Sequence, residues 1–164
     1  MKKKKTILLS FMIIAISCAF SFNISSADEA YRYVSPIEVV EYIELNEPLC
    51  LLDVQSKNEF EKHHIVGSTP TYAYPVATRP DKQKLDVAVD EIKDKKFPIV
   101  LICPRGGGAA RRSYDYLKSV GIREERLFIL WGGIEGWNYT RYFESAEEKN
   151  KTISSFDSWI ISKR

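Results

Sequence analysis

The stretch from residue 99 to residue 112, IVLICPRGGGAARR, constrains the possible folds of this chain more than any other segment. Its apolar, β-branched beginning is typical of a buried strand, and that strand ends at Cys103. Three consecutive glycines predict a tight loop after the cysteine, and a helix-like run follows. A thiol in this position lies over backbone N–H groups at a helix N-terminus, which stabilise a thiolate or an oxyanion. The segment therefore predicts a strand–loop–helix unit that presents Cys103 as a nucleophile.

Apolar strand patterns alternate with helical patterns along the rest of the chain. This alternation is typical of an α/β fold with a mostly parallel central sheet flanked by helices. Functional sites in such sheets lie at the carboxyl ends of strands, where Asp53, Cys103 and Trp131 fall. Strands are predicted over residues 49–54, 97–102 and 127–131, a brief extended piece over 72–76, and helices over 36–45, 56–63, 86–95, 109–120 and 134–139.

The N-terminus has the pattern of an export signal. Four lysines precede an almost wholly apolar run over residues 6–22, and small residues at Ser25 and Ala27 favour cleavage before Asp28. We therefore expect residues 1–27 to be a signal peptide and the protein to be exported, to the periplasm or cell envelope. Two alternatives remain open: a retained membrane anchor, and a lipoprotein in which Cys18 is lipidated.

The remaining chain, residues 28–164, has the length of one domain, with a core over about 34–139. We expect the charged and then amphipathic tail, residues 144–164, to pack back as a helix. Removing residues 1–27 takes away four lysines and no acidic residue, which leaves 20 basic and 22 acidic residues. Without a basic tract, nucleic acid is not an expected partner. The membrane is a partner only if the signal is retained or Cys18 carries a lipid.

Two cysteines, Cys50 and Cys103, remain after cleavage. An oxidising compartment would permit a bridge between them. Cys50, however, lies within an apolar strand pattern, so we interpret it as a small core residue and Cys103 as a free reactive thiol. Trp131 and Trp137 are interpreted as core residues as well.

Three segments carry motifs in a fixed order along the chain. The first is Leu51-Leu52-Asp53-Val54 with Glu59-Phe60 and His64-Ile65-Val66-Gly67-Ser68; the second is the cysteine segment with Tyr116-Leu117 and Gly121; the third is Leu130 to Trp137 with its Gly132-Gly133-Ile134. In this order the three segments resemble the rhodanese-like domain family. The resemblance implies a rhodanese-like three-layer fold. It also implies a thiosulfate-type sulfurtransferase that moves sulfane sulfur through a Cys103 persulfide to a thiophilic acceptor.

The expected site follows from the residues around the thiol. The N–H groups of Gly106, Gly107, Gly108 and Ala109 can converge on the sulfur, because glycine tolerates positive φ and has no Cβ. The side chains of Arg105, Arg111 and Arg112 can bind an anionic sulfur donor.

Two further residues are expected to support the site. Asp53 can hold the loop, and His64 can bond backbone groups near the following turn. No metal and no organic cofactor is expected. The expected partners are a small anionic sulfur donor and either a thiol acceptor or a redox partner protein.

The sequence departs from the family pattern at three places. Gln55 stands where the family commonly has Arg, His63 stands where it has Gly, and the loop after Cys103 is about one residue longer. Lengthened loops in this superfamily accompany phosphatase and arsenate-reductase activity, but Ala109 stands where those enzymes have Arg. An oxyanion enzyme of that kind, or a non-catalytic sulfur or selenium carrier, are therefore the alternative functions.

Overall fold

The computed structural model describes residues 31–145. The predicted signal peptide and the tail beyond residue 145 lie outside this range. Within it, no helix combines the length and the hydropathy needed to cross a membrane.

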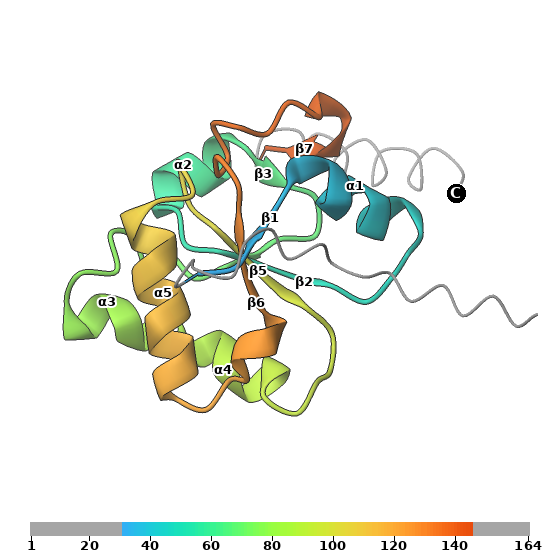
Figure 1. Ribbon diagram of the computed structural model, residues 1–164. Helices are drawn as coiled ribbons and strands as arrows, with labels where there is room; N and C mark the ends of the chain where they lie inside the picture. The colour runs from blue at the N-terminus through green and yellow to red at the C-terminus, as the bar shows by residue number, and fades with distance from the viewer. Residues whose placement is uncertain (1–30, 146–164) are drawn as a thin grey trace, which may run out of the picture.

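A five-stranded parallel sheet in the order β1-β6-β5-β2-β4 forms the centre of the domain (Figure 1). A second, two-stranded antiparallel sheet pairs β3 with β7. The strands are β1 (Tyr33–Val34), β2 (Cys50–Asp53), β3 (His64–Ile65), β4 (Thr69–Pro70), β5 (Ile99–Ile102), β6 (Leu127–Leu130) and β7 (Phe143–Glu144). The α/β fold with a mostly parallel sheet is confirmed.

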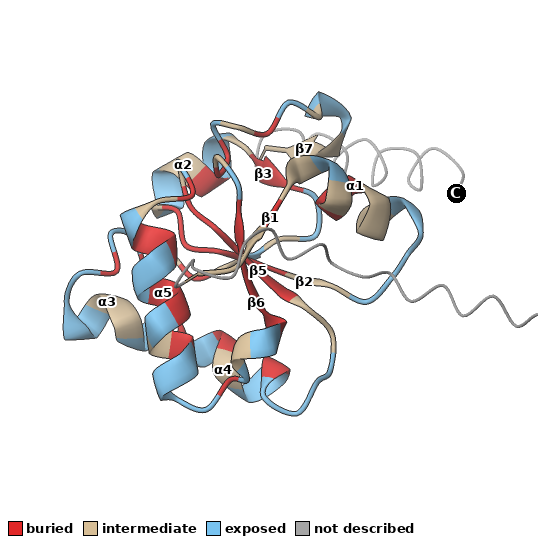
Figure 2. Ribbon diagram, viewed as in Figure 1, coloured by how far each residue is buried: buried red, intermediate tan, exposed pale blue. Residues whose placement is uncertain are grey.

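Helices cover both faces of the central sheet, and β5 and β6 are buried along their whole length (Figure 2). The strand residues alternate between two cores. Leu52, Leu101 and Ile129 pack toward α4 and α5, whereas Leu51, Val100 and Phe128 pack toward α1. This period of two follows from the pleat of the strands. The helices are α1 (Pro36–Glu44), α2 (Lys57–Lys62), α3 (Arg79–Gln83), α4 (Asp86–Ile92) and α5 (Gly108–Ser119), with 3-10 turns η1 (Glu124–Arg126) and η2 (Thr140–Tyr142).

Local signals set the helix starts. Ser35 caps α1 in a complete capping box with Glu38, and Ser56 accepts the N–H of Glu59 at the start of α2. Gly121, at φ +97°, follows the end of α5.

The predicted helix over residues 134–139 is wrong. The N–H groups of Ile134 and Glu135 donate to the carbonyls of Cys103 (3.0 Å) and Pro104 (2.9 Å), which lie in another segment, so they do not begin a helical ladder. Gly132 and Gly133 also have positive φ. The segment is a series of turns fastened to the cysteine loop.

The extended piece predicted over residues 72–76 is wrong as well. The edge strand β4 lies slightly earlier, at Thr69–Pro70, and residues 72–76 form a loop with positive φ at Tyr72 and Val76. Helix α3, which begins at Arg79 with a Pro in its first turn, was not predicted from the proline-rich sequence around it.

Candidate active site

Cys103 follows β5 directly, at the carboxyl edge of the sheet and next to the start of α5. It continues the alternation of Ile99 and Leu101, so its side chain lies on the face of the sheet that α5 covers. The residue is 2% exposed and packs with Ala109 and Ala110 of the first turn of α5. The thiol therefore lies under the N-terminus of that helix, where only a small reagent reaches it.

The loop that joins Cys103 to α5, residues 103–107 (the cysteine loop), is locked against the turn after β6. Gly106 and Gly133 have φ angles of +63° and +60°, and a Cβ on Gly133 would lie 2.2 Å from the carbonyl oxygen of Cys103. A Cβ on Gly106 would lie 2.6 Å from the carbonyl oxygen of Leu130. The two segments touch backbone to backbone, which only glycine permits at these positions.

The amide groups beside Cys103 remain available for an anion. Helix α5 begins at Gly108, and its N-cap Gly107 has no side chain that could cap it. Within residues 31–145, no carbonyl or side-chain acceptor is found for the N–H groups of Gly108, Ala109 and Ala110. These donors, with the dipole of α5, form a positive end next to the thiol.

The three predicted anion-binding arginines lie in different environments. Arg105 is exposed on the cysteine loop. The Nε of Arg111 donates to the hydroxyl of Tyr33 (3.0 Å), and its guanidinium lies 5.4 Å from the Tyr31 ring. Arg105 therefore lies on the cysteine loop, whereas Arg111 lies on α5 and contacts Tyr31 and Tyr33.

Arg112 braces the loop over residues 74–76. Its Nη2 donates to the carbonyl of Pro75 at 2.7 Å and its Nε to that of Val76 at 3.2 Å. Val76 has a φ of +60°, which is rare for a β-branched residue, so these bonds hold a strained backbone. Anion binding by Arg112 and Arg111 remains a prediction.

Asp53 lies at the carboxyl end of β2, beside β5, and is fully buried. Its carboxylate accepts the backbone N–H of Gln55 (2.8 Å) and the side-chain Nε2 of Gln55 (3.1 Å). Its carbonyl accepts the N–H and the hydroxyl of Thr71. Burial raises the pKa of Asp53 to about 7, because the two bonds from neutral Gln55 offset only part of the desolvation of the charged form.

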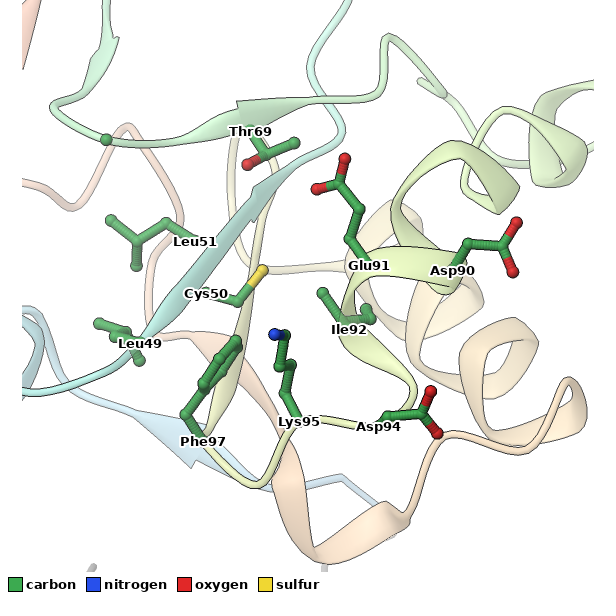
Figure 3. A pocket seen from close by; sticks show the side chains of 11 residues that line it. Leu49, Cys50, Leu51, Thr69, Asp90, Glu91, Ile92, Asp94, Lys95 and Phe97 are labelled. Carbon is green, nitrogen blue, oxygen red and sulfur yellow. The ribbon is translucent and has the colours of Figure 1, made fainter.

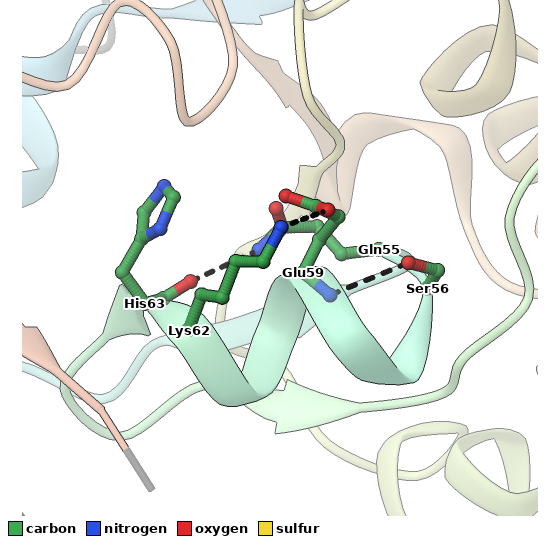
Figure 4. Close-up of polar contacts among 5 residues, drawn as sticks. All are labelled: Gln55, Ser56, Glu59, Lys62 and His63. Carbon is green, nitrogen blue, oxygen red and sulfur yellow. Dashed lines mark hydrogen bonds and ion pairs between the residues drawn. The ribbon is translucent and has the colours of Figure 1, made fainter. Parts of the chain in front are cut away.

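A cavity of about 290 Å³ lies between α2 and the cysteine loop. Arg105 and Glu135 line it on the loop side, and Gln55, Glu59 and His63 on the α2 side. In Figure 4 the Gln55 side chain reaches toward the carbonyl of His63, and Ser56 and Lys62 hold Glu59. Sequence reasoning missed this cavity, since it is assembled from four separate segments of the chain.

His64 is buried and bonds the backbone, as expected. Its Nδ1 lies 2.9 Å from the Phe60 carbonyl, and its ring stacks on the Phe60 ring at 3.8 Å. Its register partner in the small sheet is Glu144. His64 therefore anchors the turn after α2 rather than facing the thiol.

Cys50 and Cys103 lie at opposite ends of the sheet. Cys50 pairs with Ile99 at the start of β5, about 13 Å along the strands from Cys103. A disulfide needs Cα atoms within about 7 Å, and both thiols are free.

Cys50 is only partly buried and lines an open cavity of about 600 Å³ between β2 and α4, toward which its sulfur points in Figure 3. Burial raises the pKa of this thiol to about 11.

Trp131 is not a core residue. It is 61% exposed at the end of β6 and meets the Tyr33 ring edge to face, with centroids 5.3 Å apart. Trp137 is buried, as predicted.

Among the residues that the structure describes, no group of three His, Cys, Asp or Glu side chains could hold a metal ion.

Comparisons with known proteins identify the family of this chain. The family model of the rhodanese-like domain matches residues 35–140. A Buchnera aphidicola (subsp. Baizongia pistaciae) protein, named only as uncharacterized, is 25% identical over 133 residues, or 80% of this chain and 85% of that one.

Three solved structures share the fold. A rhodanese-like domain from Anabaena sp. has a TM-score of 0.55 and 19% identity, over 70% of this chain and 80% of that one. A thiosulfate sulfurtransferase from Pseudomonas aeruginosa has a TM-score of 0.54 and 20% identity, over 74% of this chain and 21% of that one. The As-Sb reductase from Leishmania major has a TM-score of 0.51 and 20% identity, over 76% and 99%. With the family match covering most of the described domain, the chain belongs to the rhodanese-like domain family.

Proposed function

We propose that this protein is a sulfurtransferase that carries sulfane sulfur as a persulfide on Cys103. The observation that carries the proposal is the position of Cys103 under the uncapped N-terminus of α5, with N–H donors available beside it. A persulfide is an anion, and these donors and the helix dipole favour an anion at that place. The shared fold of a thiosulfate sulfurtransferase is consistent with this chemistry.

The reaction has two displacement steps. The Cys103 thiolate attacks the outer sulfur of thiosulfate; a new S–S bond forms as the old one breaks, and sulfite leaves with the bonding electron pair. An acceptor thiolate then attacks the outer sulfur of the persulfide. Cys103 leaves as a thiolate, and the acceptor departs as its own persulfide.

The proposed approach for the donor is the cavity between α2 and the cysteine loop, because Pro104 and Arg105, which follow Cys103 directly, line it. Arg105 is the cation on the loop that lines this cavity, so it is the proposed contact for the sulfonate end of the donor. Glu135 and Glu59 line the same cavity, and their charges favour an acceptor that carries an ammonium group beside its thiol. With the export signal expected from the sequence, such transfer would take place in the cell envelope.

Turnover assays with two cysteine variants test the proposal. The wild-type chain and Cys50→Ser should form thiocyanate from thiosulfate and cyanide, whereas a folded Cys103→Ser should not. Equal turnover by Cys103→Ser would overturn the assignment of the sulfur-carrying residue. Hydrolysis of a phosphate ester or reduction of arsenate, without any thiosulfate turnover, would assign an oxyanion enzyme instead.

A further inference from the structure

A third concave site lies at the end of the sheet opposite Cys103. Its volume is about 330 Å³, within the size range of small-ligand sites. The segments directly before β1, β5 and β6 supply its charged residues. Because these three neighbouring strands are parallel, the segments that precede them meet at one end of the sheet. We call this site the basic cavity; its charged lining residues are Arg32, Lys96, Arg123, Arg126 and Glu125.

The basic cavity has an excess of positive charge. Four cations face a single carboxylate, and that carboxylate is already engaged, with its oxygen 3.1 Å from Nη1 of Arg123. Burial and, to a smaller extent, repulsion from the nearby charge of Arg123 lower the pKa of Arg126. A bound anion would relieve this repulsion.

Arg126 is the one buried residue among the charged residues that line the cavity. It is 3% exposed, and three of its N–H groups donate to the carbonyls of Phe97, Lys93 and Ile92. A guanidinium has five N–H donors, so two are left without a partner among residues 31–145.

The wall of the cavity holds a second guanidinium in place. Arg32 lies over the Phe128 ring at 4.5 Å and donates to the Glu125 carbonyl at 2.5 Å. Planar guanidinium groups fixed in this way match the oxygen atoms of a phosphate better than a mobile ammonium does.

We propose that the basic cavity binds a phosphate group, either of a soluble phosphate ester or of an anionic lipid headgroup. Arg32 directly precedes β1, so the N-terminal segment joins the domain at this end. A lipid headgroup is therefore within reach if that segment keeps the protein at a membrane. The site is independent of the sulfur chemistry at the other end of the sheet.

The test is a titration of the full ¹⁵N-labelled chain with inorganic phosphate. The proposal predicts saturable amide shifts around residues 96–98 and 123–126. Lys96→Gln with Arg123→Gln should weaken binding about twenty-five-fold, at roughly five-fold per cation. The matched control, Lys57→Gln with Lys82→Gln, removes two lysines from α2 and α3 and should leave the affinity unchanged.

Sedimentation with vesicles separates the two sources. Stronger binding of the full chain to phosphatidylglycerol than to phosphatidylcholine vesicles, abolished in the Lys96/Arg123 double variant only, would assign a lipid headgroup. Phosphate binding with no such preference would assign a soluble ester. The proposal is overturned if phosphate produces no saturable shifts in these segments, or if both double variants bind phosphate as the wild type does.

Discussion

The contact between the cysteine loop and Gly133 offers a quantitative test of how the site is held. Gly133 has a φ of +60°, and Gly67, in an exposed turn, has a φ of +79°. An alanine in this left-handed region costs about 1–2 kcal/mol at either position. Gly67→Ala is therefore a matched control for the backbone penalty, because a Cβ there meets nothing within 4 Å.

Gly133→Ala adds a steric effect to that penalty. The new Cβ would lie 2.2 Å from the carbonyl oxygen of Cys103 and 2.5 Å from the N of Gly106. These are backbone atoms that cannot rotate away, so the cysteine loop must move by roughly 1 Å, at an overpacking cost of about 1–3 kcal/mol. We expect unfolding free energies lower by about 1–2 kcal/mol for Gly67→Ala and by about 2–5 kcal/mol for Gly133→Ala.

The functional effect should separate the two variants further. A displacement of about 1 Å at a reacting group can reduce a rate about a hundred-fold. We therefore expect Gly133→Ala to slow persulfide formation on Cys103 to that extent, while Gly67→Ala reacts at the wild-type rate. Urea unfolding gives the stabilities, and timed mass spectrometry gives the rates. If the two variants lose equal stability and react equally fast, the loop is not positioned by Gly133.

Four other predictions concern Asp53, Arg112, Arg105 and Cys50. The pKa of Asp53 is about 7 in the folded chain, against an ordinary value of 3.8. Between these two values the native state retains a proton that the unfolded chain loses. The contribution of Asp53 to stability therefore falls as pH rises from about 4 to about 7. Asp53→Asn should remove that fall. Over this pH range, the unfolding free energy of the variant minus that of the wild type, measured in urea, should rise by on the order of 4 kcal/mol. A difference that stays constant with pH would refute the argument. Arg112→Gln should lower the unfolding free energy by about 1–2 kcal/mol, because its bonds to the Pro75 and Val76 carbonyls are lost. Arg105→Gln should instead raise the KM for thiosulfate several-fold without a change in stability. Urea unfolding measures the first effect and enzyme kinetics the second. Cys50, with a pKa of about 11, should stay unmodified by iodoacetamide at neutral pH while Cys103 reacts, as peptide mapping would show.

The sheet could be predicted from the sequence because its strands have strong local signals. The apolar runs that became β2, β5 and β6 are continuous, as expected for strands buried on both faces. The capping residues at Ser35 and Ser56 marked two helix starts. The carboxyl-edge position of Asp53 and Cys103 followed from this pattern.

The predictions that were wrong concern segments whose structure depends on contacts between distant parts of the chain. The turns after Gly133 take their hydrogen bonds from the cysteine loop, and a helical pattern over residues 134–139 cannot reveal that. Trp131 is exposed although tryptophan is usually buried. The bonds of Arg112 to the carbonyls of Pro75 and Val76 could not be predicted either, because that loop lies some 36 residues earlier in the chain; anion binding by Arg112 stays a prediction.

The mass of the intact protein before and after incubation with thiosulfate tests sulfur carriage most directly. The account predicts a gain of one sulfur atom in the wild type and in Cys50→Ser, located on the peptide that contains Cys103, and its release on addition of a thiol. A wild-type mass that does not change, or an added sulfur that persists in folded Cys103→Ser, would contradict the account.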